Sequence, residues 1–394
     1  NVRVYLAGQT LSVLGLWTQT ITMNLVVYHL TGSAGLLGAT NFLLQGPMLF
    51  VAPFAGKYIG QGNAKRIATV VMSVAGAGAA LIGTLAATNH LSIAALLCYA
   101  GVAGILSAVE MPARQVLLTS SVSEGARLAN AVAMNTLSYN IGRMTGPAIA
   151  ALLFLKAGPG AGFFIYTAAL LVMMRCVATI EVPGGISAPK EKATFTDALR
   201  HVASNSFTSL FLAVLALLGL FAASYQTLIP VLADKAFGNT AAMTGTLFAF
   251  AGGGSLTAAV ALSSRYAKDI TSRLLATAPW LCVISLGTLS FAGSAVFAAA
   301  SLYVLGFTLT LISATTNSSM QRSSPPRLRG ALAGLYGMAF LGTLPLGHLL
   351  MGALASRFDV RSAFLVASLV LAVSFALLYW RKWNADQTII GTMP

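Results

Sequence analysis

Residues 92–115 read "SIAALLCYAGVAGILSAVEMPARQ", in which eighteen residues without a charge lead into a glutamate and an arginine one helical turn apart. A helix needs about 20 such residues to cross a bilayer. Runs of this kind recur along the chain, since 57% of its 394 residues are hydrophobic, 8% are charged and the mean hydropathy is +0.81. Because lipid cannot hydrogen-bond to the backbone, these runs predict an all-α membrane protein that crosses the bilayer many times.

The sequence contains twelve candidate spans. They lie near residues 5–30, 35–59, 66–88, 92–117, 127–155, 160–180, 207–233, 241–264, 273–293, 296–320, 329–356 and 360–380. The longest polar interruption, 181–206, opens with Pro and Gly and becomes amphipathic from Thr194, which favours a tether on the membrane surface over a binding site. We therefore expect a bundle at 1–180, a cytoplasmic linker with an amphipathic helix at 181–206, a second bundle at 207–382 and a cytoplasmic tail at 383–394.

The positive charges lie in alternate loops. If the N-terminus is cytoplasmic, seventeen Lys and Arg residues fall in inside segments and only four, Lys156, Lys235, Arg357 and Arg361, fall outside. This bias predicts that both termini are cytoplasmic. It also accounts for the net charge of +14 through membrane topology, so that no nucleic-acid partner is expected.

The two halves of the chain resemble each other at an offset near 200 residues. The stretch "WTQTI" at 17–21 corresponds to "SYQTLIP" at 224–230, and "GRMTGPAIAALL" at 142–153 corresponds to "GTLPLGHLLMGAL" at 342–354. With six spans on each side of the linker, these matches predict two pseudo-symmetric six-helix bundles. In such duplicated transporters the substrate binds near the midplane between the halves, and access alternates by rocking.

Four longer stretches carry a resemblance to a known family. They are "YHLTGSAGLLGA" at 28–39, "EMPARQVLLTSSVSEGARLANA" at 110–131, "NIGRMTGPAIAALL" at 140–153 and "QRSSPPRLRGALAGLYGMAFLGTLPLGHLLMGALA" at 321–355. In order and spacing they resemble the major facilitator superfamily, in particular the branch of enterobactin-type siderophore exporters and macrolide-type drug efflux proteins. The resemblance implies the major facilitator fold and export across the bacterial inner membrane.

The antiporter motif of that superfamily matches the fifth span at Gly142, Gly146 and Pro147, with Ala150 and Ala151 at its two small positions. Small residues one turn apart let helices approach closely, and the proline bends the span. The resemblance implies an exporter, whereas the alternative is tight packing with no bearing on the direction of transport.

The cytoplasmic gate motif departs from the family pattern. The first-half loop, "GKYIGQGNAKR" at 56–66, supplies Gly56, Lys65 and Arg66 but has Gly60 and Gln61 where the family places an Asp-Arg pair. The second-half loop, "SSRYAKDITSR" at 263–273, keeps an acid among bases at Arg265, Asp269 and Arg273. We expect these charges to serve gating and topology rather than substrate binding.

Glu110 is the only one of the nine acids that falls inside a span. A carboxylate within the membrane is costly and suggests a function, here the binding of a coupling proton. The alternative is an ion pair with Arg114, four residues later on the same face, which would supply the inner-gate carboxylate that the first-half loop lacks. His348, well inside the eleventh span, is a second proton-coupling candidate or a packing residue.

Arg143 is placed near the membrane midplane. A guanidinium facing the central cavity would bind a carboxylate, catecholate or phosphate, and the alternative is a hydrogen bond to carbonyls of neighbouring helices. Other polar residues in the spans either join helices or contact substrate. These candidates are Gln19, Asn24, Asn135, Tyr139, Asn140, Tyr225, Gln226, Asn317 and Tyr336.

The sequence contains no metal-ligand cluster, Walker-type loop or nucleophile-base pairing, so we expect neither an enzyme nor a cofactor or metal site. Without an ATP site, transport should draw on an ion gradient. The prediction is a monomeric transporter that exports a siderophore-like metabolite or drug by proton antiport. The alternative is an uncoupled facilitator, or an importer of a small anionic metabolite.

Overall fold

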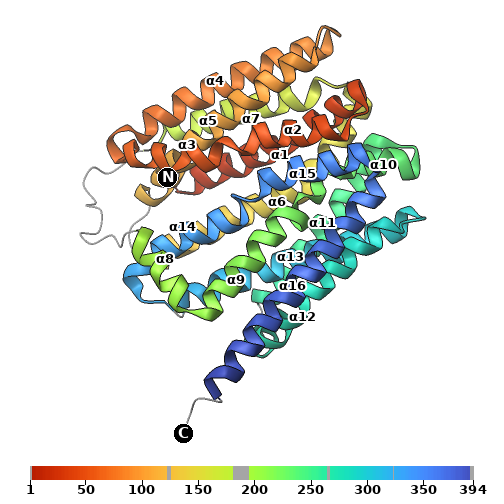
Figure 1. The fold of residues 1–394 in the computed structure, drawn as a ribbon. Helices are drawn as coiled ribbons and strands as arrows, with labels where there is room; N and C mark the ends of the chain where they lie inside the picture. The colour runs from red at the N-terminus through yellow and green to blue at the C-terminus, as the bar shows by residue number, and fades with distance from the viewer. Residues whose placement is uncertain (1, 122–125, 181–194, 264–266, 323, 391–394) are drawn as a thin grey trace.

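The computed structural model describes residues 2–121, 126–180, 195–263, 267–322 and 324–390. Within these residues the chain is helical and contains no strand (Figure 1). The first half consists of α1 (Val2–Thr31), α2 (Ala34–Gln45), α3 (Pro47–Tyr58), α4 (Gln61–Ala87), α5 (Ile93–Ser120), α6 (Ala126–Ala157) and α7 (Ala161–Ala178). Pro47, at the first position of α3, lacks the N–H that would be left unpaired there, so α3 follows α2 with only Gly46 between them.

The second half follows the short helix α8 (Phe195–Ser204). It opens with a composite segment made of α9 (Ser206–Leu217), a π-helix (Leu218–Ala222), a 3-10 helix (Ala223–Leu228) and α10 (Ile229–Phe237). It continues with α11 (Thr240–Ser263), α12 (Ala267–Ser290), α13 (Ala295–Arg322), the 3-10 helix Pro326–Leu328, α14 (Arg329–Phe340), α15 (Leu344–Arg357) and α16 (Val360–Ile390).

The twelve expected spans each fall on a helix or on consecutive helices. Within the described residues, ten segments are long and apolar enough to cross a membrane, and Thr277–Ser290 in α12 is a shorter apolar helix. The helix α6 takes the place of the fifth span, where Arg143 and three asparagines lower the hydropathy. The prediction of an all-α membrane protein with this helix order is confirmed.

The helix α8 lies where the sequence predicts an amphipathic segment, although most of the linker, 181–194, falls outside the described residues. Its Ala198 is fully buried against Leu328 and Leu332, near the start of α14. Leu199 is 45% exposed. The described part of the linker therefore packs on the second half through one face.

The helices of each half pack mainly on one another. In the first half α1 contacts α6 and α7, and α4 contacts α5 and α7. In the second half α13 contacts α11 and α12, and α12 also contacts α16. The first half and the second half lie side by side, with most of the first half in the upper part and most of the second half in the lower part of Figure 1.

The two halves meet mainly through the helix pairs α6–α11 and α2–α15. Glycines make both approaches close. A Cβ atom on Gly38 of α2 would lie 2.5 Å from the carbonyl oxygen of His348, and one on Gly252 of α11 would lie 2.7 Å from the Cα of Met144. Larger residues would push the halves apart at these points.

Candidate functional site

Glu110 and Arg114 form an ion pair on α5, and both are buried, at 7% and 8% exposure. The guanidinium also donates to Gln9 Oε1 at 2.9 Å and to Ser12 Oγ at 2.8 Å, both on α1. Tyr5, also on α1, donates its hydroxyl proton to the Arg114 carbonyl at 2.9 Å. A buried ion pair is tolerated when further hydrogen bonds satisfy its charges, as they do here for Nη1 and Nη2 of Arg114, although its Nε has no partner among the described residues.

The helix remains continuous through Pro112, which lies between the two charged residues. The four-residue spacing therefore holds both side chains on one face, as the ion-pair interpretation requires. Glu110 and Arg114 take these partners from within the first half, so this pair does not bridge the halves.

The first-half gate loop is held to the end of α7 through Lys65. Lys65 Nζ donates to the carbonyl oxygens of Ala178 and Ile180, at 2.8 and 2.9 Å, and so joins the start of α4 to the end of α7. Arg66, Gly56 and Gly60 are exposed. In the second-half loop, Arg265 and the side chains of Asp269 and Arg273 lie outside the described residues.

Arg143 on α6 reaches across to the second half. Its Nη2 donates to Ser255 Oγ on α11 at 2.9 Å and to Thr310 Oγ1 on α13 at 3.4 Å. These partners are hydroxyl groups rather than the backbone carbonyls of the alternative interpretation. Among the described residues no carboxylate pairs with Arg143, so its positive charge is not neutralised by an ion pair.

The antiporter motif lies between α1 and α11. A Cβ atom on Gly142 would lie 2.8 Å from Val13 Cγ1, and one on Gly146 would lie 2.6 Å from Trp17 Cβ, so both glycines are packed against α1. On α11, a Cβ atom on Gly245 would lie 2.6 Å from Ala151 Cβ. The Gly-Pro helix is therefore packed on both faces, one of them at the boundary between the halves.

His348 is buried between the halves, at 1% exposure. Its Nε2 lies 3.1 Å from Gln45 Nε2 on α2, and its Nδ1 lies 2.6 Å from Thr227 Oγ1 in the second half. Because an amide nitrogen only donates, this geometry corresponds to a neutral ring with the proton on Nδ1. Reversing the Gln45 amide would present its oxygen to a protonated Nε2 instead.

Two of the polar candidates join helices of the first half. Gln19 donates to the Tyr99 hydroxyl on α5 at 2.8 Å, and Asn24 exchanges hydrogen bonds with Asn41 on α2 at 3.4 and 3.0 Å. Both Gln19 and Asn24 are almost fully buried, at 1% and 2% exposure. Such pairs join helices, which is one of the two roles predicted for these residues.

The other candidates have varied surroundings. Tyr139 lies near Gln9, Tyr336 lies near Ser313, and Asn317 accepts from Gln321 on its own helix at 2.9 Å. The Oδ1 of Asn135 is buried without a hydrogen-bond partner among the described residues. Tyr225 is buried, Gln226 is partly exposed, and the side chain of Asn140 lies outside the described residues.

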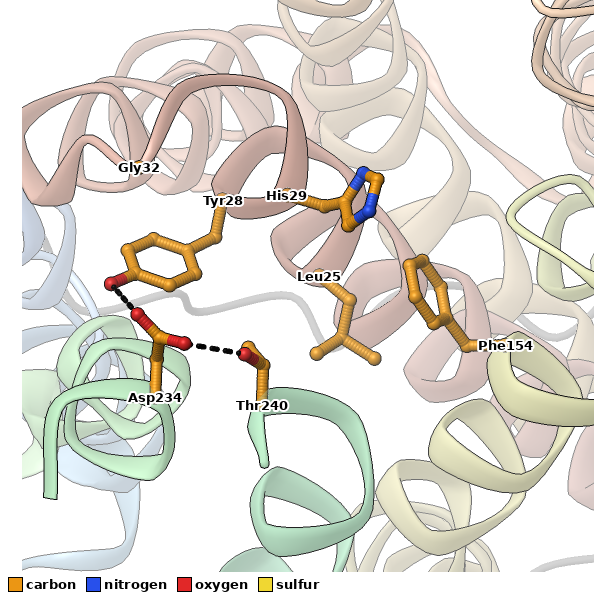
Figure 2. Close-up of a pocket in the computed structure, with 7 residues that line it drawn as sticks. All are labelled: Leu25, Tyr28, His29, Gly32, Phe154, Asp234 and Thr240. Atoms are coloured by element: carbon orange, nitrogen blue, oxygen red, sulfur yellow. Dashed lines mark hydrogen bonds between the residues drawn. The ribbon is translucent and has the colours of Figure 1, made fainter. Parts of the chain in front are cut away.

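Asp234, which the sequence places near an external end and to which it assigns no role, joins the halves at that end. The chain turns at Gly238, whose φ of 66° few other residues adopt, and this turn brings Thr240 back to Asp234. Thr240 donates to Oδ1 at 3.0 Å, and Tyr28 of α1 donates to Oδ2 at 2.9 Å. Figure 2 shows both bonds at the edge of a cavity of about 260 Å³.

These contacts place the molecule in one access state. The bonds Tyr28–Asp234 and Gln45–His348 and the approach of Gly38 to Gly352 join the halves in the part of the bundle that the positive-inside pattern assigns to the outside. With the halves joined there, this state is closed toward the predicted external side.

A family model described as transmembrane secretion effector matches residues 2–389. The staphyloferrin A transporter of Staphylococcus aureus is 26% identical over 60% of this chain, and the match spans 60% of that relative's length. The multidrug efflux pump Tap of Mycolicibacterium fortuitum is 25% identical over 88% of this chain and 86% of its own.

Two solved structures share the fold across most of the chain. One is a bacterial homologue of the human lysosomal transporter Spinster in an inward-facing, unoccupied conformation, with a TM-score of 0.76 and 15% identity over 96% of this chain and 95% of that one. The other is a point mutant of the nucleoside transporter NupG, with a TM-score of 0.75 and 13% identity over 96% of this chain and 100% of that one. At these identities the likeness concerns the fold alone.

Proposed function

The chain belongs to the transmembrane secretion effector family of major facilitator transporters, and from that premise we propose that it exports a siderophore-like metabolite or drug by proton antiport. It is a multi-pass membrane transporter and not an enzyme. The proposed location is the inner membrane, with both termini cytoplasmic and a monomer as the working unit.

The observation that carries the proposal is Arg143 at the boundary of the halves. Its guanidinium binds hydroxyl groups of α11 and α13 and has no carboxylate partner among the described residues. An unneutralised guanidinium suits a planar anion, because it can donate two parallel hydrogen bonds to a carboxylate or catecholate. A substrate anion bound there would contact helices of both halves.

Export and a siderophore-like substrate draw support from the relatives. One bears the name of a transporter of staphyloferrin A, a siderophore, and the other the name of a multidrug efflux pump. Export is also supported by Gly142, Gly146 and Pro147 on α6, because these residues resemble the antiporter motif of the superfamily.

We assign the coupling proton to His348 rather than to Glu110. Glu110 is paired with Arg114 inside one half, and this ion pair favours a fixed charge. His348 instead accepts a hydrogen bond from Gln45 of the opposite half, a bond that must break when the halves separate on the outer side. Its proton state is therefore tied to the access state, which is what coupling requires.

Transport into inside-out membrane vesicles tests the proposal. Vesicles from cells with the protein, acidified inside, should accumulate an anionic metabolite or drug from a cell extract against its gradient, and a protonophore should abolish accumulation. Vesicles carrying Arg143→Gln should lose most of it, whereas Arg175→Gln, which removes an exposed charge on α7, should not. Equilibration without concentration, insensitive to the protonophore, would instead establish the uncoupled facilitator.

A further inference from the structure

The cavity at the outer junction of the halves contains a charged group, the carboxylate of Asp234, that takes no part in the proposed binding of substrate or of the coupling proton. It is lined by Leu25, Tyr28, His29, Gly32, Phe154, Asp234 and Thr240, which come from both halves (Figure 2). At about 260 Å³ it is smaller than the sites that hold drug-sized ligands, and it fits a compact molecule.

The Asp234 carboxylate is the anionic group of this cavity and has no cationic partner. Its hydrogen bonds come from the neutral hydroxyls of Tyr28 and Thr240, at 2.9 and 3.0 Å. Among the described residues no Lys or Arg lies within ion-pair distance of it, and the neighbouring Lys235 is exposed. A partly buried charge without a counter-charge attracts a cation.

Aromatic rings form much of the remaining wall. Tyr28 lies beside Asp234, and the rings of His29 and Phe154 meet edge to face with centroids 6.0 Å apart on the other side of the cavity. Ring faces attract organic cations, and cages of aromatic side chains with an acid recognise methylated ammonium groups. An inorganic cation would instead need several oxygen ligands, and Asp234 is the only carboxylate that lines the cavity.

We propose that this cavity binds a small organic ammonium ion from the external side. The ammonium group contacts Asp234, and its methyl or methylene groups contact the rings of Tyr28 and Phe154. Because Tyr28 and Phe154 belong to the first half and Asp234 and Thr240 to the second, the site is complete only while the outer ends are joined. Bound ammonium therefore stabilises the state that is closed on the outer side and slows export.

Binding of choline to the purified full-length protein tests the site without reference to any exported substrate. Saturation-transfer NMR of the trimethylammonium protons should give a dissociation constant. The uncharged carbon analogue of choline, 3,3-dimethyl-1-butanol, should bind at least tenfold more weakly. Equal binding of the two compounds would contradict a cation site.

Variants locate the site. Asp234→Asn should weaken choline binding at least tenfold, and Phe154→Leu should weaken it about threefold or more, as expected for a lost cation–π contact. Asp359→Asn is the matched control, because Asp359 is an exposed acid at the same predicted side but outside the cavity. Thermal unfolding shows that each variant is folded. The proposal fails if choline does not bind to the folded wild type, or if Asp359→Asn weakens binding as much as Asp234→Asn.

The effect on the access state has its own measurement. In cells, external choline should slow substrate export by the wild-type protein. Export by Asp234→Asn should have the same rate with and without choline. Inhibition that persists in Asp234→Asn would show that choline acts elsewhere.

Discussion

Glu110 and Arg114 form their ion pair one turn apart on α5, and the guanidinium directs its further hydrogen bonds to Gln9 and Ser12 of α1. These partners of the pair therefore all belong to the first half. A lock between the halves requires partners on both of them, so in this state the pair fixes α5 to α1 instead. The inner-gate role predicted for Glu110 requires a state in which the pair has partners on the second half.

Neutralising Glu110 should destabilise the fold. Glu110→Gln leaves the Arg114 charge buried without its counter-charge, and breaking such a pair costs about 3 kcal/mol in free energy of unfolding. Thermal unfolding should show the loss, and the double variant Glu110→Gln with Arg114→Gln should recover part of it because no lone charge remains. A single variant as stable as the wild type would mean that the pair does not form.

Removing the charge of Arg143 should weaken substrate binding more than stability. Arg143→Gln can still donate to Ser255 but lacks the guanidinium, so the KM for an anionic substrate should rise about tenfold or more. Arg143→Lys keeps the charge but lacks the paired donors, so its KM should lie between those of the wild type and Arg143→Gln. Transport kinetics in vesicles measure both. An unchanged KM in Arg143→Gln would exclude it from the binding site.

Replacing His348 should separate transport from the proton gradient. In His348→Gln, downhill movement of substrate should continue, whereas accumulation driven by an imposed proton gradient should disappear. Glu110→Gln, in the fraction that folds, should keep proton-driven accumulation. If the two variants behave the opposite way in the vesicle assay, the coupling proton belongs to Glu110.

A side chain at Gly146 should disturb the contact between α6 and α1. The Cβ atom of Gly146→Ala would lie 2.6 Å from Trp17 Cβ, so helix α6 must shift, at a cost of about 1–3 kcal/mol in free energy of unfolding. Gly56→Ala is the control, because nothing lies within 4 Å of a Cβ there. Equal thermal stability of the two variants would contradict the packing described for the antiporter motif.

Much of the fold could be predicted from local sequence. The apolar runs set the helices, because each must satisfy its own backbone in lipid. The polar interruption at 181–206 separates the groups of spans. The spacing of Glu110 and Arg114 is likewise local, since residues four apart on a helix share a face whatever surrounds them.

The contacts between the two halves could not be predicted from the sequence, because the residues that form them lie far apart along the chain. Arg143 and Ser255 are 112 residues apart, and Gln45 and His348 are 303 apart. The sequence therefore placed the charge of Arg143 and the ring of His348 within the membrane but left open what each would bind.

The sequence by itself determined an all-α, multi-pass membrane protein, because hydrophobicity acts along single helices, and its resemblance to the major facilitator superfamily implied a transporter. Only the tertiary structure decided which polar groups meet. It paired Glu110 with Arg114 within one half, placed Arg143 and His348 in contact with the other half, and joined Asp234 to Tyr28, 206 residues away, at the end of the bundle that is predicted to face outside. The reason is physical: a hydrogen bond forms only within about 3.5 Å, and packing of the two halves alone sets distances between such remote residues.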